Sequence, residues 1–197
     1  MRNILIIKTL LYFLILFCFT SCAENYTPKP RGYFRIALPE KKYVKLDSIY
    51  PYSFEYPVYA KITNDPLSPQ EKNWITINFP QLKGSLHVSY KPIKSKADLN
   101  VYIEDSRALA LKHMPKSSGI NYIRIEDNNN KIYGLAYDIK GSTAASPYQF
   151  YLTDSTRHFL RASLYFETIP NNDSLQPVIQ FVKKDIEHLV ETMKWKN

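Results

Sequence analysis

Apolar and polar residues alternate along four short segments in the first half of the chain. The alternation covers residues 34–38, 54–58, 75–79 and 86–90. A period of two is typical of strands that bury one face and expose the other. Residues 80–85, which include Pro80 and Gly84, predict a hairpin turn between the last two of these strands.

A helical pattern follows from residue 95. Ser95 and Asp98 have the spacing of a capping box, with Asp in the place of the usual Glu. Pro115 and Gly119 are expected to end the helix. One broad apolar face is formed by Leu99, Tyr102, Ile103, Ala110 and Met114.

Strands resume after this helix, at residues 122–125, 132–139, 148–153 and 159–166. The polar segments 127–130 and 154–157 are the expected turns of two hairpins. Residues 141–147 form a loop of small side chains. Such a loop permits close approach of a ligand or a partner, although an ordinary hairpin connection explains the same composition.

A second helix ends the chain. Asp173 or Ser174 is expected to cap it, with Pro177 in its first turn. Its apolar stripe consists of Leu175, Val178, Ile179, Val182, Ile186, Leu189, Val190 and Met193. Four charged residues take the opposite side: Lys183, Lys184, Glu187 and Glu191. An amphipathic helix of this kind covers one face of a sheet, and binding to a partner or to lipid is the alternative.

The element order is therefore four strands, a helix, four strands and a helix. Short hairpins between sequence neighbours predict a largely antiparallel sheet. The expected fold class is α+β, with a sheet of about six to eight strands covered by two helices. Residues 32–197 are expected to form this single domain. By analogy the arrangement resembles the PsbP/Mog1-type sandwich, and the pattern leaves the strand order undetermined.

The N-terminal segment reads as an export signal. Arg2 precedes a long apolar run, and polarity changes immediately after Cys22. The sequence FTSC at residues 19–22 resembles the lipobox of bacterial lipoproteins, with Phe19 in the place of the usual aliphatic residue. The resemblance implies that a peptidase cuts before Cys22 and that its sulfur and new amino group are acylated. Residues 1–21 are then a signal peptide.

Two other interpretations of this segment remain open. An uncleaved transmembrane anchor needs roughly 20 apolar residues, and Lys8 divides this run. A secreted protein cut near Ser21 would keep Cys22 as an unpaired thiol, which is unusual outside the cytoplasm. Acyl chains on Cys22 would hold the protein at a membrane, because each buried CH₂ contributes about 0.8 kcal/mol. Residues 22–31 would be the lipidated N terminus and a short proline-containing linker.

Charge and cysteine content restrict the possible partners. Loss of Arg2 and Lys8 with the signal peptide lowers the formal net charge from +8 to +6. The basic residues are scattered among acidic ones, which argues against nucleic-acid binding. This surface suits anionic lipid or an acidic protein, and simple solubility explains it equally well. Cys18 also leaves with the signal, so the mature chain can form no internal disulfide.

Asp154, Ser155 and His158 are the residue types of a hydrolase triad. All three lie within one hairpin, whereas triads are usually assembled from separate elements, and the G-x-S-x-G motif is missing. We therefore expect Asp154 and Ser155 to cap the turn and expect no enzyme activity. No metal or other cofactor is expected, because the four histidines lack metal-ligand spacing and the five glycines form no phosphate-binding loop.

Seven short motifs are spread over nearly the whole mature chain. They are PKPRGY (28–33), PYSF (51–54), AASPYQF (144–150), TDS (153–155), HFL (158–160), SLYF (163–166) and TMKWK (192–196). These motifs resemble those of the GldD family of gliding-motility lipoproteins of the Bacteroidetes. Ala162 stands where the family is expected to have glycine, a difference that concerns packing.

The resemblance implies a membrane-anchored accessory of the gliding machinery, linked to type IX secretion and acting through contacts with other envelope proteins. It carries over no catalytic residue, and only Cys22 transfers, as the lipidated residue. The expected location is the cell envelope, with the periplasmic side of the outer membrane favoured because Ala23 is not acidic. The alternative is a periplasmic module that binds cell-wall glycan or lipid, with exposed tyrosines stacking on sugars.

The expected contact surfaces are the segment 28–33 and the loops between residues 141 and 158. Nucleic acid and a small-molecule substrate are not expected as partners. The candidate contact residues are Arg31, Tyr33, Ser146, Tyr148, Asp154, Ser155, Arg157 and His158.

Overall fold

The computed structural model describes residues 6, 8, 36–46 and 49–196. The chain divides into two units, Met1–Phe34 and Arg35–Asn197, and the elements below belong to the second unit. The predicted cleavage site, Cys22 and the linker 22–31 lie outside the described residues, as do Arg31 and Tyr33.

The second unit is built on a seven-stranded sheet in the order β4-β5-β6-β10-β9-β8-β7. Every neighbouring pair is antiparallel, so the predicted α+β class with a largely antiparallel sheet is confirmed. The strands are β4 (Lys61–Asn64), β5 (Ile75–Phe79), β6 (Gly84–Pro92), β7 (Gly119–Asp127), β8 (Ile132–Lys140), β9 (Tyr148–Thr153) and β10 (His158–Phe166).

Two small antiparallel pairs accompany this sheet. β1 (Tyr43–Lys45) pairs with β3 (Glu55–Pro57), and β11 (Lys194–Trp195) pairs with β2 (Tyr52–Ser53). The strand predicted at residues 34–38 was wrong where the structure describes it, because residues 36–38 are irregular. Ile36 and Leu38 are both exposed by more than a third, so their alternation reflects no buried face.

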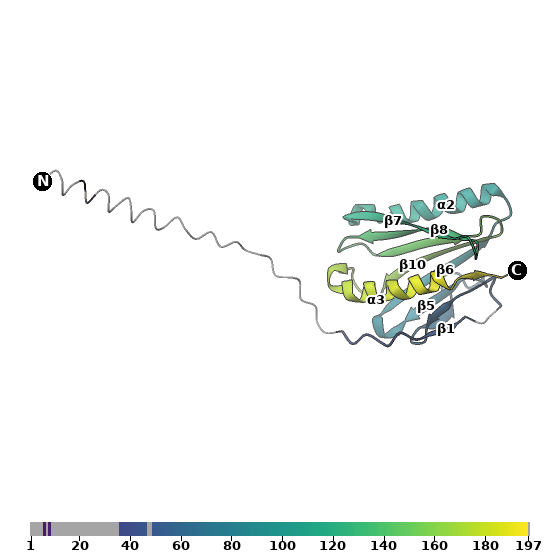
Figure 1. The fold of residues 1–197 in the computed structure, drawn as a ribbon, viewed down its shortest axis with the longest axis horizontal. Coiled ribbons are helices and arrows are strands. Elements are labelled where there is room, and N and C mark those ends of the chain that lie inside the picture. Colours follow the sequence, from purple (N-terminus) through teal and green to yellow (C-terminus); the bar gives the residue numbers. More distant parts are fainter. Residues whose placement is uncertain (1–5, 7, 9–35, 47–48, 197) are drawn as a thin grey trace. The chain divides into compact units, whose positions relative to one another are not determined.

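Two helices cover opposite faces of the sheet. They are α2 (Lys96–Leu111) and α3 (Asn172–Glu191). Ala136 of β8 packs in the cluster that contains Val182 of α3, whereas its neighbour Tyr137 packs with Ala110 of α2. Successive residues of a strand point to opposite faces, so the two helices lie on either side. In Figure 1, α3 crosses in front of the strands and α2 lies above them.

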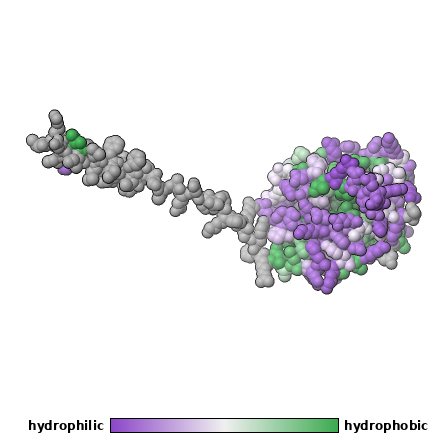
Figure 2. Space-filling view, viewed as in Figure 1, coloured by the Kyte–Doolittle hydropathy of each residue, from purple (hydrophilic) through white to green (hydrophobic). Residues whose placement is uncertain are grey.

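The main core lies under α3. Its most buried large side chains come from four neighbouring central strands and from the segment before β4. On the face of the second unit seen in Figure 2, most of the surface is hydrophilic, with smaller hydrophobic patches. The fully buried side chains of this main core include Tyr52, Phe54, Ile75, Ile77, Leu86, Phe150, Leu152, Leu160 and Leu164.

Helix α2 begins as predicted and ends earlier. The Ser95 hydroxyl accepts from the Asp98 backbone N–H at 3.2 Å, and the Asp98 carboxylate accepts from the Ser95 N–H at 3.0 Å. This is the predicted capping box. The helix stops at Leu111, and Met114 lies in a separate 3₁₀ turn, Met114–Lys116, with 53% of its surface exposed. Its predicted place on the apolar face was therefore wrong.

Helix α3 differs from its prediction at both its cap and its polar side. The N-cap is Asn171, whose side chain accepts from the Ser174 N–H, and Pro177 lies beyond the first turn. Lys183, predicted on the exposed side, is only 7% exposed. Its ammonium group pairs with the Asp138 carboxylate of β8 at 2.9 Å, which is what permits its burial.

Candidate binding cleft

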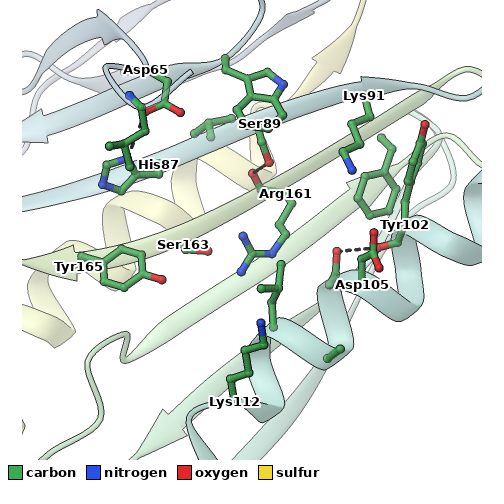
Figure 3. A pocket seen from close by; sticks show the side chains of 17 residues that line it. Asp65, His87, Ser89, Lys91, Tyr102, Asp105, Lys112, Arg161, Ser163 and Tyr165 are labelled. Carbon is green, nitrogen blue, oxygen red and sulfur yellow. Dashed lines mark hydrogen bonds and ion pairs between the residues drawn. The ribbon is translucent and has the colours of Figure 1, made fainter. Parts of the chain in front are cut away.

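A cleft of about 670 Å³ opens on the face of the sheet that α2 covers. α2 packs mainly against β9 and β10, and residues of β6 line the cleft beside it. The polar positions of β6 and β10 line the cleft together with residues of α2. In Figure 3, Arg161 and Ser163 project from β10, with Asp105 and Lys112 on the helix across from them. A volume of this size suits a small molecule or a short peptide segment.

Arg161 supplies the central cation of the cleft. Its guanidinium donates to the Gln149 side-chain oxygen on β9 at 2.6 Å. Within the described part of the chain, no carboxylate forms an ion pair with it. Burial lowers the pKa of Arg161, because low polarity disfavours its charged form. An arginine nevertheless keeps its proton at neutral pH, so Arg161 brings into the cleft a positive charge that has no ion-pair partner among the described residues.

Two buried polar side chains next to Arg161 each have an atom without a hydrogen-bond partner among the described residues. Ser163 lies two positions along β10 on the same face, and Gln149 is its cross-strand neighbour on β9. They are 2% and 1% exposed. The Ser163 hydroxyl and the Gln149 side-chain nitrogen have no hydrogen-bond partner among the described residues. Buried polar groups without partners are rare in folded proteins, which marks this part of the sheet as unusual.

Aromatic residues form one end of the cleft. The ring centroids of Tyr102 and Phe159 lie 5.4 Å apart, and Phe159 stacks on Tyr151 at the same distance. The Lys91 ammonium lies 4.7 Å from the centre of the Tyr102 ring. Tyr165 lines the opposite part, in edge contact with His87. The cleft thus combines flat apolar walls with a cationic floor.

His87 is held in place by its neighbours at the far end of the cleft. One ring nitrogen lies 3.2 Å from the Thr76 hydroxyl and the other lies 3.2 Å from the Ser85 hydroxyl. The Asp65 carboxylate is 3.8 Å from the first nitrogen. Asp65 also accepts from the backbone N–H of Leu67, so this carboxylate is already engaged on its own side of the cleft.

The 154–158 hairpin uses its polar residues for the turn. One Asp154 carboxylate oxygen accepts from the backbone N–H groups of Thr156, Arg157 and His158 at 2.8–2.9 Å. Burial alone would raise the pKa of Asp154, but these hydrogen bonds outweigh it and lower the pKa. Ser155 is exposed and has a positive φ of 66°. The carboxylate thus contacts the backbone of His158, which is the turn cap predicted for Asp154. At Ser155 the backbone N–H donates to the Thr153 hydroxyl instead, and the side-chain cap predicted for Ser155 is not seen.

The His158 side chain is buried in the core, whereas Ser155 lies on the exposed turn. Its Nδ1 lies 2.8 Å from the Tyr90 hydroxyl, and its ring stacks on Trp195 with centroids 5.1 Å apart. Nε2 has no hydrogen-bond partner in the part of the chain that is described. Burial lowers the pKa of His158, and the Asp154 charge offsets this only in part. His158 therefore joins β6, β10 and the C-terminal β11 as a neutral side chain.

This burial predicts a pH-dependent stability. A histidine in the unfolded chain has a pKa of about 6.5, and the pKa of folded His158 is lower. As the pH falls below about 6.5, the unfolded chain therefore binds a proton before the folded protein does. The stability that neutral His158 supplies is lost over this range, down through its folded pKa. The slope from one such group is at most about 1.4 kcal/mol per pH unit. Urea unfolding between pH 7.5 and pH 5 measures it.

The His158→Gln variant should flatten this slope. Burial and the nearby Arg161 also lower the pKa of His113, so the His113→Gln variant is the matched control and should retain the part due to His158. Equal slopes for the wild type and the His158→Gln variant would contradict the assignment.

The small-residue loop 141–147 lies at a second cavity, of about 560 Å³. The side-chain amide of Asn172 donates to the carbonyl oxygens of Gly141 and Ala144 at 2.8 and 2.9 Å, which fixes the loop on α3. Ser146 and Tyr148 are buried, at 0% and 5% exposed. Burial raises the pKa of Tyr148 to about 12. Of the candidate contact residues described, Ser155 and Arg157 present exposed side chains.

In the described segments, no group of three or more His, Cys, Asp or Glu side chains is arranged to hold a metal ion. None of the helices in the described ranges is both long and apolar enough to cross a bilayer.

A family model for the gliding motility lipoprotein GldD matches residues 23–195. The chain belongs to the GldD family. It is thus a gliding motility lipoprotein associated with the cell envelope. No curated protein matches the chain.

One solved structure similar to this GldD-family chain is the cyanobacterial PsbP (CyanoP) from Synechocystis sp. PCC 6803. The match covers 80% of this chain and 95% of that chain, at 12% identity and a TM-score of 0.47. A likeness at this level carries no argument about function.

Sequence reasoning missed the cleft as a site. Arg161 and Ser163 occupy the polar positions of a correctly predicted strand. Polar residues at such alternating positions normally predict a solvent-exposed face, with no indication of a site. The available signal was an arginine and a serine on a strand face that also carries the aromatic residues Phe159 and Tyr165. Whether the Arg161 and Ser163 side chains line a cleft or face open solvent depends on where α2 packs, and the local sequence pattern does not determine that.

Proposed function

We propose that this protein is a membrane-anchored, non-enzymatic accessory of the gliding machinery, linked to type IX secretion and acting through protein–protein contacts. The family match carries the proposal, since it extends over residues 23–195 and begins directly after Cys22. Cys22 would be the acylated residue, and residues 22–31 the linker to the folded unit. The periplasmic face of the outer membrane is the favoured location.

The hairpin geometry also supports a non-enzymatic role. A serine hydrolase needs a histidine side chain that can accept the serine proton. His158 instead lies in the core against Tyr90 and Trp195, while Ser155 lies on the exposed turn. Contacts through exposed residues of this hairpin, such as Arg157, remain the proposed use of the loop.

The test is complementation of a deletion strain. The strain without the gene is expected to lose spreading on agar and delivery of its surface adhesins, and the wild-type gene should restore both. The Cys22→Ala variant should move to the soluble envelope fraction and fail to restore spreading, because no other residue is proposed to carry acyl chains. The Cys18→Ala variant is the matched control and should behave as the wild type.

Two results would contradict the proposal. Normal spreading and secretion in the deletion strain would remove the protein from the machinery. Full restoration by a soluble Cys22→Ala protein would remove the anchor from the mechanism. If neither result is found, crosslinking in cells followed by mass spectrometry identifies the proteins that contact the exposed hairpin.

The second candidate is a module that binds cell-wall glycan. Half-buried Tyr102 and Tyr165 line an open cleft on the polar sheet face, and aromatic rings there suit stacking on sugars. Enrichment of the protein on purified peptidoglycan, lost in a Tyr102→Ala variant, would favour this function. Absence of enrichment would leave the protein-contact role.

A further inference from the structure

We propose that the cleft between α2 and the sheet binds a ligand with a carboxylate group, held by Arg161 and Ser163, whose apolar part lies against the aromatic wall. The proposal concerns binding by the folded unit and stands apart from the membrane anchor. Failure of the Cys22 experiments would therefore leave it intact, and its own failure would leave the anchoring role intact.

The guanidinium of Arg161 provides the charge complement. A guanidinium has five N–H donors in a planar fork that matches the two oxygens of a carboxylate. One terminal nitrogen of Arg161 donates to Gln149, and no acidic side chain in the described ranges pairs with the group. Figure 3 shows the guanidinium directed from β10 toward α2 inside the cleft. The remaining donors are thus positioned for an anion from outside the described chain.

Ser163 supplies the independent observation. Its hydroxyl lines the cleft, is nine-tenths buried and has no hydrogen-bond partner among the described residues. A hydroxyl in this state loses its hydrogen bonds with water on folding and regains none within the described protein, so it destabilises the fold. A ligand oxygen that accepts from both the hydroxyl and the Arg161 guanidinium, which has no acidic partner among the described residues, would explain why the serine is there.

The surrounding residues restrict the ligand further. Tyr102 and Phe159 form a flat apolar wall, so an apolar group next to the carboxylate would be buried. Asp105 of α2 also lines the cleft and opposes a second negative charge. A single carboxylate fits this balance better than a doubly charged phosphate, and a neutral sugar would leave the guanidinium uncompensated.

A carboxylate of this kind has two sources, the C-terminal end of a polypeptide or a small organic acid. The probes are N-acetyl-Ala-Ala-Phe with a free C-terminal carboxylate, the same peptide as its amide, and hexanoate. Binding is measured by isothermal titration of the full-length protein in mild detergent. Binding of the free peptide with at least tenfold loss for the amide supports a polypeptide source, and comparable binding of hexanoate supports a small acid.

Matched variants test the assigned residues. Arg161→Gln keeps a donor for Gln149 and should weaken binding about ten- to hundredfold, as expected for a lost charged hydrogen bond. Ser163→Ala should weaken it about three- to tenfold while folding at least as stably as the wild type, because the hydroxyl lacks a partner among the described residues. Asp105→Asn should strengthen binding. Lys184→Gln, which removes one positive charge from the exposed side of α3, should leave it unchanged.

Three results would overturn the proposal. The first is no binding of either acid at millimolar concentration to the folded wild-type protein. The second is equal binding of the peptide acid and its amide. The third is undiminished binding by both the Arg161→Gln and Ser163→Ala variants, with folding of each checked by circular dichroism.

Discussion

Replacement of Asp185 by alanine is expected to lower the free energy of unfolding by about 3–5 kcal/mol. The carboxylate lies on α3 with 1% of its side chain exposed, and it pairs with the Lys41 ammonium. The hydroxyl groups of Tyr43, at 2.7 Å, and Tyr59 also donate to it. Removal of Asp185 leaves the Lys41 charge, whose side chain is 30% exposed, and two hydroxyl groups without their acceptor.

Urea or thermal unfolding of the variant measures this loss. Asp185→Asn should cost less, because its amide oxygen still accepts from a tyrosine, although the charge pair with Lys41 is gone. Glu187→Ala, at an exposed position of the same helix, is the control and should change stability by less than about 0.5 kcal/mol. A loss below about 1 kcal/mol for Asp185→Ala would show that the cluster contributes little.

The Asp185 cluster joins the first described segment to the last helix. The Tyr43 ring stacks on His188 of α3 with centroids 3.8 Å apart, and His188 pairs with the Glu55 carboxylate at 2.8 Å. Burial and the hydrogen bond to Asp185 raise the pKa of Tyr43, so its hydroxyl stays protonated and remains a donor.

The alternating segments predicted the central strands well, for a physical reason. β5 has the predicted bounds 75–79, and β9 has the predicted bounds 148–153. In both strands every second side chain packs in the main core, and these positions are apolar, so the alternation is visible in the strands' own residues. The edge strand β4 was missed because its residues Lys61–Asn64 are mostly exposed, and β11 has only two residues.

The hydrophobic pattern failed mainly at charged residues that are buried in the structure. A helical count assigns Lys183 to the polar side because of its residue type. Its burial depends on Asp138, 45 positions earlier, and that of Asp185 on Lys41, 144 positions earlier. The cleft depends in the same way on the packing of α2 against β9 and β10. Such long-range pairs are absent from any local window of sequence.

The core shows how small and large residues are matched across strands. Phe150 in β9 has Ala162 of β10 as its neighbour on one side and Ala136 of β8 on the other. Both alanines are fully buried, and Phe150 is 1% exposed. The two small side chains leave the volume that the phenyl ring fills. Ala162, where the family resemblance predicts glycine, therefore contributes one methyl group to the wall of this space.

The Phe150→Ala variant is accordingly expected to lose about 3–5 kcal/mol of unfolding free energy, since neither neighbouring alanine can fill the cavity. Phe150→Leu keeps most of the volume and should lose less than about 1.5 kcal/mol. Tyr122→Ala removes a ring that is 53% exposed and serves as the aromatic control, with a much smaller loss. Similar losses for Phe150→Ala and Tyr122→Ala in urea unfolding would contradict this account, because stability would then not depend on the packing of β9 between its two alanine-bearing neighbours.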